Sequence, residues 1–348
     1  MLVVSFMPYF PDDQVNRVYA GYRIWNWRRF REQLVPDAPT RAYLDRYFGL
    51  FVLPNGDPER RIAIVSQEGQ PIFPQQGDLQ QKEIGRFAGA VMASYLFNFP
   101  AEQSAGWMAC SSDNFVAFFQ PFDATAVPAA TAFEYGSYVR IRVLGSWDHL
   151  RFTTPQHMPD PRPCFCDEEI LNRLATLSVE QNELVERIFR SLDWVRLAFA
   201  NYEGFQYPAR IVAMATAFEI LLDFRDVGKA QHFSKEVNLL LPPNRLPTTT
   251  QPWGAKARPL SDNDIGWWCR SFYSLRSRIV HGEELQPGDF QHGSGTEHLR
   301  IALNIFAECI QGLLIGMGRM QEEKRRQRFW FRRTWIDQLG LPDDVWYP

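Results

Sequence analysis

A proline-rich segment near the middle of the chain separates two regions with different sequence patterns. Four of the ten residues from Thr154 to Pro163 are proline, which is too many for a helix or for a central strand. We interpret 156–166 as a linker between an N-terminal domain, 1–155, and a C-terminal domain, 167–348. A chain of 348 residues with 45% apolar content is sufficient for two domains with cores of their own.

Short runs of aromatic and β-branched residues recur before the linker, separated by Pro, Gly, Asp and Asn. This pattern is typical of strands joined by turns. The expected strands are Val3–Phe10, Tyr22–Trp27, Ile62–Ser66, Phe115–Phe119 and Tyr138–Val143. One helix is expected among them, from about Lys82 to Phe97. The pattern predicts an α+β fold, in which a domain with a mixed, mostly antiparallel sheet precedes a helical domain.

Helical spacing begins after the linker. Asp167, Glu168 and Glu169 place acidic residues at a helix start, where the helix dipole favours them. The helical region continues at the apolar positions Leu184, Ile188, Leu192, Val195 and Phe199. Pro208 is expected to begin the helix that carries Glu219. We therefore expect 167–348 to form an all-helical bundle.

The segment from Asp264 to His281 is expected to be an amphipathic helix. Its apolar positions follow steps of four, three and four, and a polar stripe ending at His281 follows the same steps on the opposite side. The apolar positions are Trp268, Phe272, Leu275 and Ile279, and the polar ones are Arg270, Ser274, Ser277 and His281. A histidine at the end of a polar stripe does not belong to the core.

Arg276 and His281 do not share one face of a straight helix, because they lie roughly 140° apart around its axis. They could converge if the last turn unwinds at Gly282, a natural helix stop. They could also meet across a two-fold axis, if a second copy of the helix packs against the first.

The stretch Tyr273-Ser274-Leu275-Arg276-Ser277-Arg278-Ile279-Val280-His281-Gly282 resembles the HEPN superfamily, whose signature is an arginine followed after four to six residues by a histidine. The order of the aromatic residue, Arg-Ser and His-Gly is similar to that of the Apea-like branch. An upstream helix, 213–222, also resembles that branch, because Glu219 precedes paired leucines. The resemblance covers approximately 165–320.

This resemblance implies a HEPN-like helical bundle that forms a homodimer and acts as a metal-independent endoribonuclease on RNA, without a cofactor. It also implies a toxin, antiphage defence or stress-response role, with an activity held off until a trigger arrives. The N-terminal domain would then be the sensor for that unknown trigger or partner.

The residue types themselves also fit RNA cleavage. Cleavage through the 2′-hydroxyl needs a base, an acid and a cation near the phosphate, and an imidazole titrates near neutral pH. We expect His281 to transfer protons and Arg276 to hold the phosphate. Ser277 would orient a phosphate or water, Glu219 would fix an arginine through an ion pair, and Arg278 is a further supporting candidate.

Two other interpretations of the sequence stay open. Arg276 could pair with Glu219 purely as architecture, while His281 caps a helix C-terminus, where a cation is favoured. The domain would then be a non-catalytic module for dimerisation or for binding nucleotide or RNA. Ser277 favours this interpretation, because many HEPN proteins that resemble ribonucleases carry Asn, Asp or His directly after the arginine. A third interpretation makes the N-terminal domain the enzyme, although its sequence contains no catalytic constellation.

A basic, aromatic segment follows the bundle. Its cations could track a phosphate backbone while its aromatic residues stack on unpaired bases; alternatively, the aromatic residues dock on the protein and the cations lie in water. The cations are Lys324, Arg325, Arg326, Arg328, Arg332 and Arg333.

The sequence favours a soluble, cytoplasmic protein without a membrane segment. The N-terminus lacks the basic start and cleavage site of a signal peptide. The apolar stretch 87–99 is shorter than the roughly 20 residues that span a bilayer, and polar residues interrupt the apolar stretch nearest the C-terminus. Five scattered cysteines fit a reducing compartment, and neither they nor any acidic cluster predicts a metal site.

Overall fold

A computed structural model describes residues 2–11, 15–34, 37–53, 55–67, 72–74, 78–97, 112–122, 130–134, 140–143, 151–153, 166–200, 206–224, 229–241, 264–292 and 296–321. The chain divides into two compact units. Unit 1 comprises 1–99 and 107–181, and unit 2 comprises 100–106 and 182–348. Apart from Cys166, the expected linker lies outside the described residues, as does the basic segment from Lys324 to Arg333.

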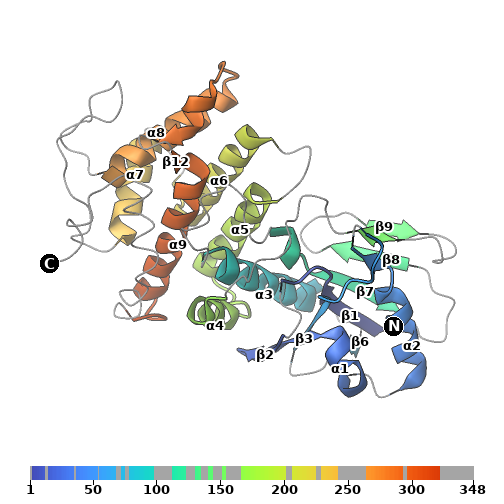
Figure 1. The fold of residues 1–348 in the computed structure, drawn as a ribbon. Helices are drawn as coiled ribbons and strands as arrows, with labels where there is room; N and C mark the ends of the chain where they lie inside the picture. Colours follow the sequence, from blue (N-terminus) through green and yellow to red (C-terminus); the bar gives the residue numbers. More distant parts are fainter. Residues whose placement is uncertain are drawn as a thin grey trace, which may run out of the picture. The chain divides into compact units, whose positions relative to one another are not determined.

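Unit 1 is built on an eight-stranded sheet (Figure 1), and every strand pair within this sheet is antiparallel. The strands run in the order β2 (Asn16–Tyr19), β3 (Tyr22–Asn26), β5 (Ala63–Gln67), β1 (Leu2–Met7), β7 (Phe118–Phe122), β8 (Ala130–Glu134) and β9 (Arg140–Val143), and β6 (Ile72–Pro74) also pairs with β1. A separate parallel pair joins β4 (Phe51–Val52) to β10 (Phe152–Thr153). The α+β class and the mostly antiparallel sheet predicted from the sequence are confirmed.

The expectation of one helix among these strands is wrong, because α1 (Trp27–Leu34) and α2 (Ala38–Phe48) precede α3 (Asp78–Leu96). In α1, Trp27 and Phe30 are buried one turn apart, whereas Arg28 lies exposed between them. That spacing belongs to an amphipathic helix rather than to a strand. A side-chain cap at Asp37, which accepts a hydrogen bond from the amide of Thr40, begins α2.

The two faces of β3 pack against different helices. On one face Trp25 meets Phe30 of α1, with ring centroids 5.2 Å apart. On the other face Tyr22 stacks on Phe87 of α3 at 4.5 Å. Phe6 of β1 has no exposed surface and contacts aromatic rings of α2. Unit 1 therefore buries aromatic side chains on both sides of its sheet.

The helix α4 (Glu168–Leu177) begins at Asp167, whose side chain accepts a hydrogen bond from the Ile170 amide. It was expected to open the helical domain, but it lies within unit 1. The amide of Asp167 donates to the Ser94 carbonyl of α3 at 2.9 Å. Arg86 of α3 donates to the carbonyl of Ser178, directly after α4, at 3.2 Å. These contacts place the end of unit 1 after α4, near Gln181.

Unit 2 is a helical bundle around an aromatic core. Its helices are α5 (Glu183–Ala198), α6 (Tyr207–Leu222), α7 (Lys229–Leu240), α8 (Asp264–Val280) and α9 (His298–Gly316). A short 3-10 turn, η3 (Pro287–Phe290), and a two-stranded pair, β11 (Gln291–His292) with β12 (Thr296–Glu297), connect α8 to α9. Phe218 of α6 lies at the centre, with aromatic contacts to residues of α7, α8 and α9, namely Phe233, Trp268, Phe272 and Phe306.

Among the described residues, α9 is the one helix whose length and composition would allow it to cross a membrane. It is mostly buried inside the protein, and every residue from Ile301 to Gln311 is buried. The polar residues that interrupt it, Asn304, Glu308 and Gln311, are part of this buried stretch. These features are those of a core helix of unit 2.

Candidate active site at the end of helix α8

The apolar stripe expected of α8 is present at three of its four positions. Trp268, Phe272 and Leu275 are buried against the bundle, whereas Ile279 is only partly buried. Ser274 and His281 of the expected polar stripe are exposed, and Arg270 and Ser277 are partly buried. The apolar stripe therefore fixes the rotation of α8 about its own axis. That rotation brings the side chains of Tyr273 and Arg276, which lie one turn apart, close to α6.

Glu219 of α6 contacts both of these side chains. Its Oε1 accepts a hydrogen bond from the Tyr273 hydroxyl at 2.5 Å and lies 3.5 Å from Nη2 of Arg276. The arginine and glutamate side chains are 23% and 18% exposed, so the ion pair is screened less than a surface pair. The carboxylate thus holds the Arg276 guanidinium beside α6.

Tyr273 also supports the arginine directly. The guanidinium carbon of Arg276 lies over the Tyr273 ring, 5.6 Å from its centroid. Burial raises the pKa of Tyr273, and the hydrogen bond to Glu219 raises it further. The hydroxyl consequently stays protonated and donates to Glu219. The Nε of Arg276 is buried without a hydrogen-bond partner.

His281 lies just beyond the last turn of α8, at a helix end closed by glycine. Gly282 has a positive φ of +72°, and its amide donates to the Ile279 carbonyl at 3.1 Å. The amide of Glu283 donates to the Arg278 carbonyl at 3.0 Å. These two bonds form a Schellman motif, with glycine at the position that requires a left-handed backbone. His281 is exposed there, and no hydrogen bond or ion pair joins its imidazole to the described residues.

Arg278 has a different partner from Arg276. Its guanidinium donates to both carboxylate oxygens of Asp289, at 2.8 and 3.2 Å, and to Glu283 at 3.1 Å. These bonds raise the pKa of Arg278. The chain after His281 is therefore tied back to α8 by a bidentate pair. We call 283–292 the return segment.

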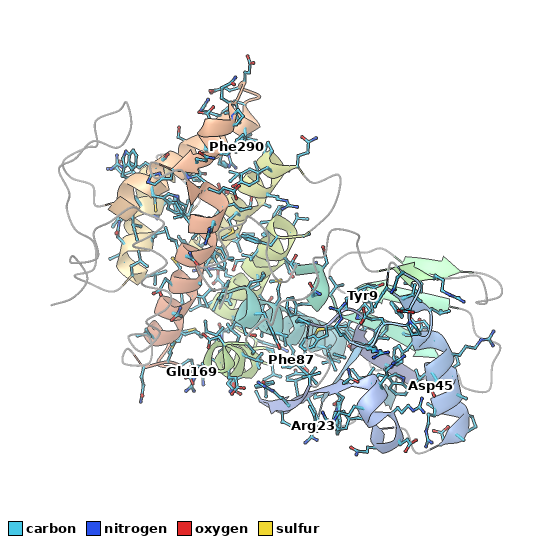
Figure 2. The ribbon with its side chains drawn as sticks, in the orientation of Figure 1. Tyr9, Arg23, Asp45, Phe87, Glu169 and Phe290 are labelled. Carbon is cyan, nitrogen blue, oxygen red and sulfur yellow. The ribbon has the colours of Figure 1, made fainter. Side chains whose placement is uncertain are left out.

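Aromatic contacts hold the remainder of the return segment. Phe290, labelled in Figure 2, packs edge-on against Tyr207 of α6 at 5.3 Å. His292 lies 4.5 Å from the ring of Trp267 of α8 and 5.6 Å from the ring of His298. Burial lowers the pKa of His292 to about 3, with a further contribution from His298, and burial lowers the pKa of His298 to about 4. Both imidazoles are therefore neutral near pH 7.

The structure brings only some of the predicted site residues together. Glu219 contacts Arg276, while Arg278 turns to the return segment. Ser277 is partly buried, and its carbonyl accepts a hydrogen bond from the backbone amide of His281 at 3.0 Å. Within one chain, no described contact joins the side chains of Arg276 and His281. The structure describes no group of three or more His, Cys, Asp or Glu side chains that could hold a metal ion.

Two contributors were missed in the sequence. Tyr273 was part of the motif but received no role, although its i, i+3 spacing from Arg276 places both on one helical face. Asp289 gave no such signal, because its contact with Arg278 depends on the path of the return segment.

No family model matches the chain, and no curated protein or solved structure matches it either. The likeness to HEPN proteins therefore depends on the residues quoted from the sequence.

Proposed function

We propose that this protein is a HEPN-type, metal-independent endoribonuclease, with His281 in proton transfer and Arg276 on the scissile phosphate. One observation carries the proposal. The exposed imidazole of His281 has no partner among the described residues, and it lies five residues beyond an arginine that Glu219 holds in place. Histidine is the side chain most often used as a general acid or base, and this one is exposed at a helix end that Gly282 closes.

In the proposed reaction, one His281 removes the proton from a ribose 2′-hydroxyl, and the 2′-oxygen attacks the adjacent phosphorus. The bond from phosphorus to the 5′-oxygen breaks, and a second, protonated His281 gives its proton to that oxygen. The products are a 2′,3′-cyclic phosphate and a 5′-hydroxyl. Arg276 stabilises the negative charge that grows on the phosphate oxygens during the attack.

Two proton transfers in one turnover call for two histidines, which a homodimer of the helical domain supplies. Val280, directly before His281, is 52% exposed. A second copy that packs at this end of α8 would cover the Val280 side chain. Such a pairing would also bring Arg276 of one protomer toward His281 of the other.

The test is cleavage of labelled RNA by the full chain in EDTA. We expect His281→Ala and Arg276→Ala to lose at least about 100-fold in rate. Arg276→Lys keeps a cation beside Glu219 but loses the planar fork, so it should fall between the wild type and Arg276→Ala. His232→Ala is the matched control, because His232 is a half-exposed histidine on α7 of the same unit. Equal rates for His281→Ala and His232→Ala would refute the proposal.

A second candidate function is a non-catalytic module for dimerisation or for binding nucleotide or RNA. The contact that favours it is the Arg276–Glu219 pair, which already satisfies part of the guanidinium within the bundle. A protein of this kind would bind RNA or nucleotide with unchanged affinity after His281→Ala and would cleave no RNA. Sedimentation of the full chain with and without RNA would show whether a dimer forms.

The proposed enzyme acts in the cytoplasm, in a toxin, antiphage or stress-response role. Unit 1 would serve as the sensor that releases the activity. Without its trigger the purified chain would then cleave slowly, and removal of His281 would abolish that residual rate.

A further inference from the structure

Asn26 joins two arginine-bearing segments of unit 1. Its Oδ1 accepts a hydrogen bond from the amide of Arg29, in the first turn of α1, at 3.1 Å. Its Nδ2 donates to the carbonyl of Arg60 at 2.9 Å. The adjacent amide of Trp27 donates to the Ile62 carbonyl at 2.9 Å. The segment before β5 is thereby fixed beside the start of α1, although about thirty residues separate them in the chain.

Two aromatic rings connect Arg23 of β3 to the start of α1. The guanidinium of Arg23, labelled in Figure 2, lies 4.6 Å from the ring centroid of Trp25. Trp25 contacts Phe30, and Arg29 lies 5.5 Å from the Phe30 ring centroid. Arg23 and Arg29 therefore rest on one continuous pair of buried rings. We call Arg23, Arg28, Arg29 and Arg60 the arginine patch.

Two carboxylates near these residues pair with other arginines. Arg31 pairs with Asp45 at 3.3 Å, and Arg61 pairs with the buried Glu59 at 3.0 Å. Arg28 and Arg60 are exposed, and no carboxylate of the described residues pairs with either of them. The charges of Arg28 and Arg60 are thus not neutralised by any ion pair that the structure describes, in a chain whose net charge is −3.

The backbone at the start of α1 also favours a negatively charged ligand. The first turn of α1 contains no acidic residue, so the positive end of the helix dipole is not neutralised there. Guanidinium groups also present paired donors that match phosphate oxygens. Trp25 and Phe30 are only 8% and 6% exposed, so they support the guanidinium groups and cannot stack on bases. The surface suits a phosphodiester backbone and gives little means to read sequence.

We propose that the arginine patch binds the phosphate backbone of the RNA on which unit 2 acts. This inference rests on the proposed function for the choice of RNA, and it assigns to unit 1 a role in holding the substrate. Binding through phosphates should be weakly dependent on sequence and strongly dependent on salt.

The experiment measures binding separately from cleavage. A labelled single-stranded RNA of mixed sequence is titrated with full-length His281→Ala, and the affinity is read by fluorescence anisotropy at several salt concentrations. In this background we expect Arg28→Glu and Arg60→Glu each to weaken binding about tenfold at low salt, and to flatten the plot of log K against log salt. Neither side chain has a partner among the described residues, so the melting temperature should stay unchanged.

Arg190→Glu is the matched control. Arg190 is an exposed arginine of α5 without a partner among the described residues. Its substitution by glutamate changes the net charge by the same amount as each patch variant. We expect it to retain the parent affinity. The inference is overturned if the parent does not bind RNA, if both patch variants bind as the parent does, or if the control weakens binding equally. If the patch variants weaken salt-sensitive binding but the wild-type chain cleaves no RNA, the proposed catalysis is refuted and the assignment of RNA binding to the arginine patch is retained.

Discussion

The Glu219 carboxylate lies 3.5 Å from the Arg276 guanidinium, so a side chain of α6 fixes the arginine of the candidate site. The same oxygen accepts the hydrogen bond of Tyr273. Because one carboxylate oxygen makes both contacts, loss of the Glu219 side chain leaves the Arg276 guanidinium and the Tyr273 hydroxyl without this partner. The site and the packing of α6 on α8 therefore depend on the same residue.

Glu219→Ala should lower the free energy of unfolding by about 2 kcal/mol, because a hydrogen bond to a charged group at a partly buried position is lost. Chemical denaturation of the full chain measures this. Glu236→Ala is the control, since Glu236 pairs with His232 four residues earlier along α7, and such helical surface pairs contribute at most about 0.5 kcal/mol. An equal loss in both variants would contradict the role given to Glu219.

Gly282→Ala should cost about 1 kcal/mol, because its left-handed backbone is unfavourable for a residue with a Cβ. No atom within 4 Å would clash with the new methyl group, so the cost comes from the backbone alone. Gly288→Ala in η3 meets no atom within 4 Å and has no positive φ, so thermal unfolding should show little change. The position of His281 should shift only in the first variant, and with it the rate of RNA cleavage.

Gly312→Ala should be the more damaging of two changes in α9. A Cβ at Gly312 would lie 2.3 Å from the carbonyl oxygen of Leu240, so α7 and α9 would have to separate. We expect a loss of more than about 2 kcal/mol. Gly316→Ala meets no atom within 4 Å and should be neutral or stabilising by up to about 1 kcal/mol. Comparable melting temperatures for the two variants would contradict this close approach of the helices.

Acid should destabilise unit 2 through its buried imidazoles. The pKa of His298 is about 4 in the folded protein, below its ordinary value of 6.5, so between these pH values the unfolded chain binds more protons. The free energy of unfolding therefore falls as the pH drops from 6.5 toward 4, by up to about 1.4 kcal/mol per pH unit for each such group. His292, with a folded pKa of about 3, extends the fall to lower pH.

His298→Phe tests this directly. Nδ1 of His298 is buried without a hydrogen-bond partner, so an apolar ring of similar shape loses no contact of that atom. Melting temperatures between pH 7 and pH 4 should decline less steeply in this variant than in the wild type. His281→Ala, at an exposed position, should retain the wild-type decline. A wild-type curve in His298→Phe would show that this imidazole does not contribute.

Periodicity and end signals predicted much of unit 2. The buried residues Trp268, Phe272 and Leu275 follow the expected stripe of α8, and Gly282 closes that helix. Both features depend on residues that are close in sequence, because the apolar stripe and the C-terminal glycine are defined within one or two helical turns. The strands β1, β3, β5, β7 and β9 of unit 1 were predicted from short runs of aromatic and β-branched residues between turn formers, whereas β2, β6 and β8 were not.

Contacts that depend on tertiary packing were not predicted. Trp27, the first residue of α1, was predicted to end a strand, because aromatic residues favour strands and the segment is short. The inclusion of α4 in unit 1 depends on the contact of Arg86 with the Ser178 carbonyl, which no local pattern signals. The same holds for Arg278, whose partner Asp289 is reached only because the return segment folds back on α8.

RNA cleavage by His281 is tested most directly by giving the enzyme two RNA strands in EDTA that differ only by a single 2′-deoxyribose at the cleavage site. We expect the all-ribose strand to be cut to a 2′,3′-cyclic phosphate and a 5′-hydroxyl by the wild type and by His232→Ala, but not by His281→Ala. We expect the deoxy-substituted strand to stay intact at that site. Cleavage of the substituted strand there, or the same products from His281→Ala at the wild-type rate, would contradict this role of His281.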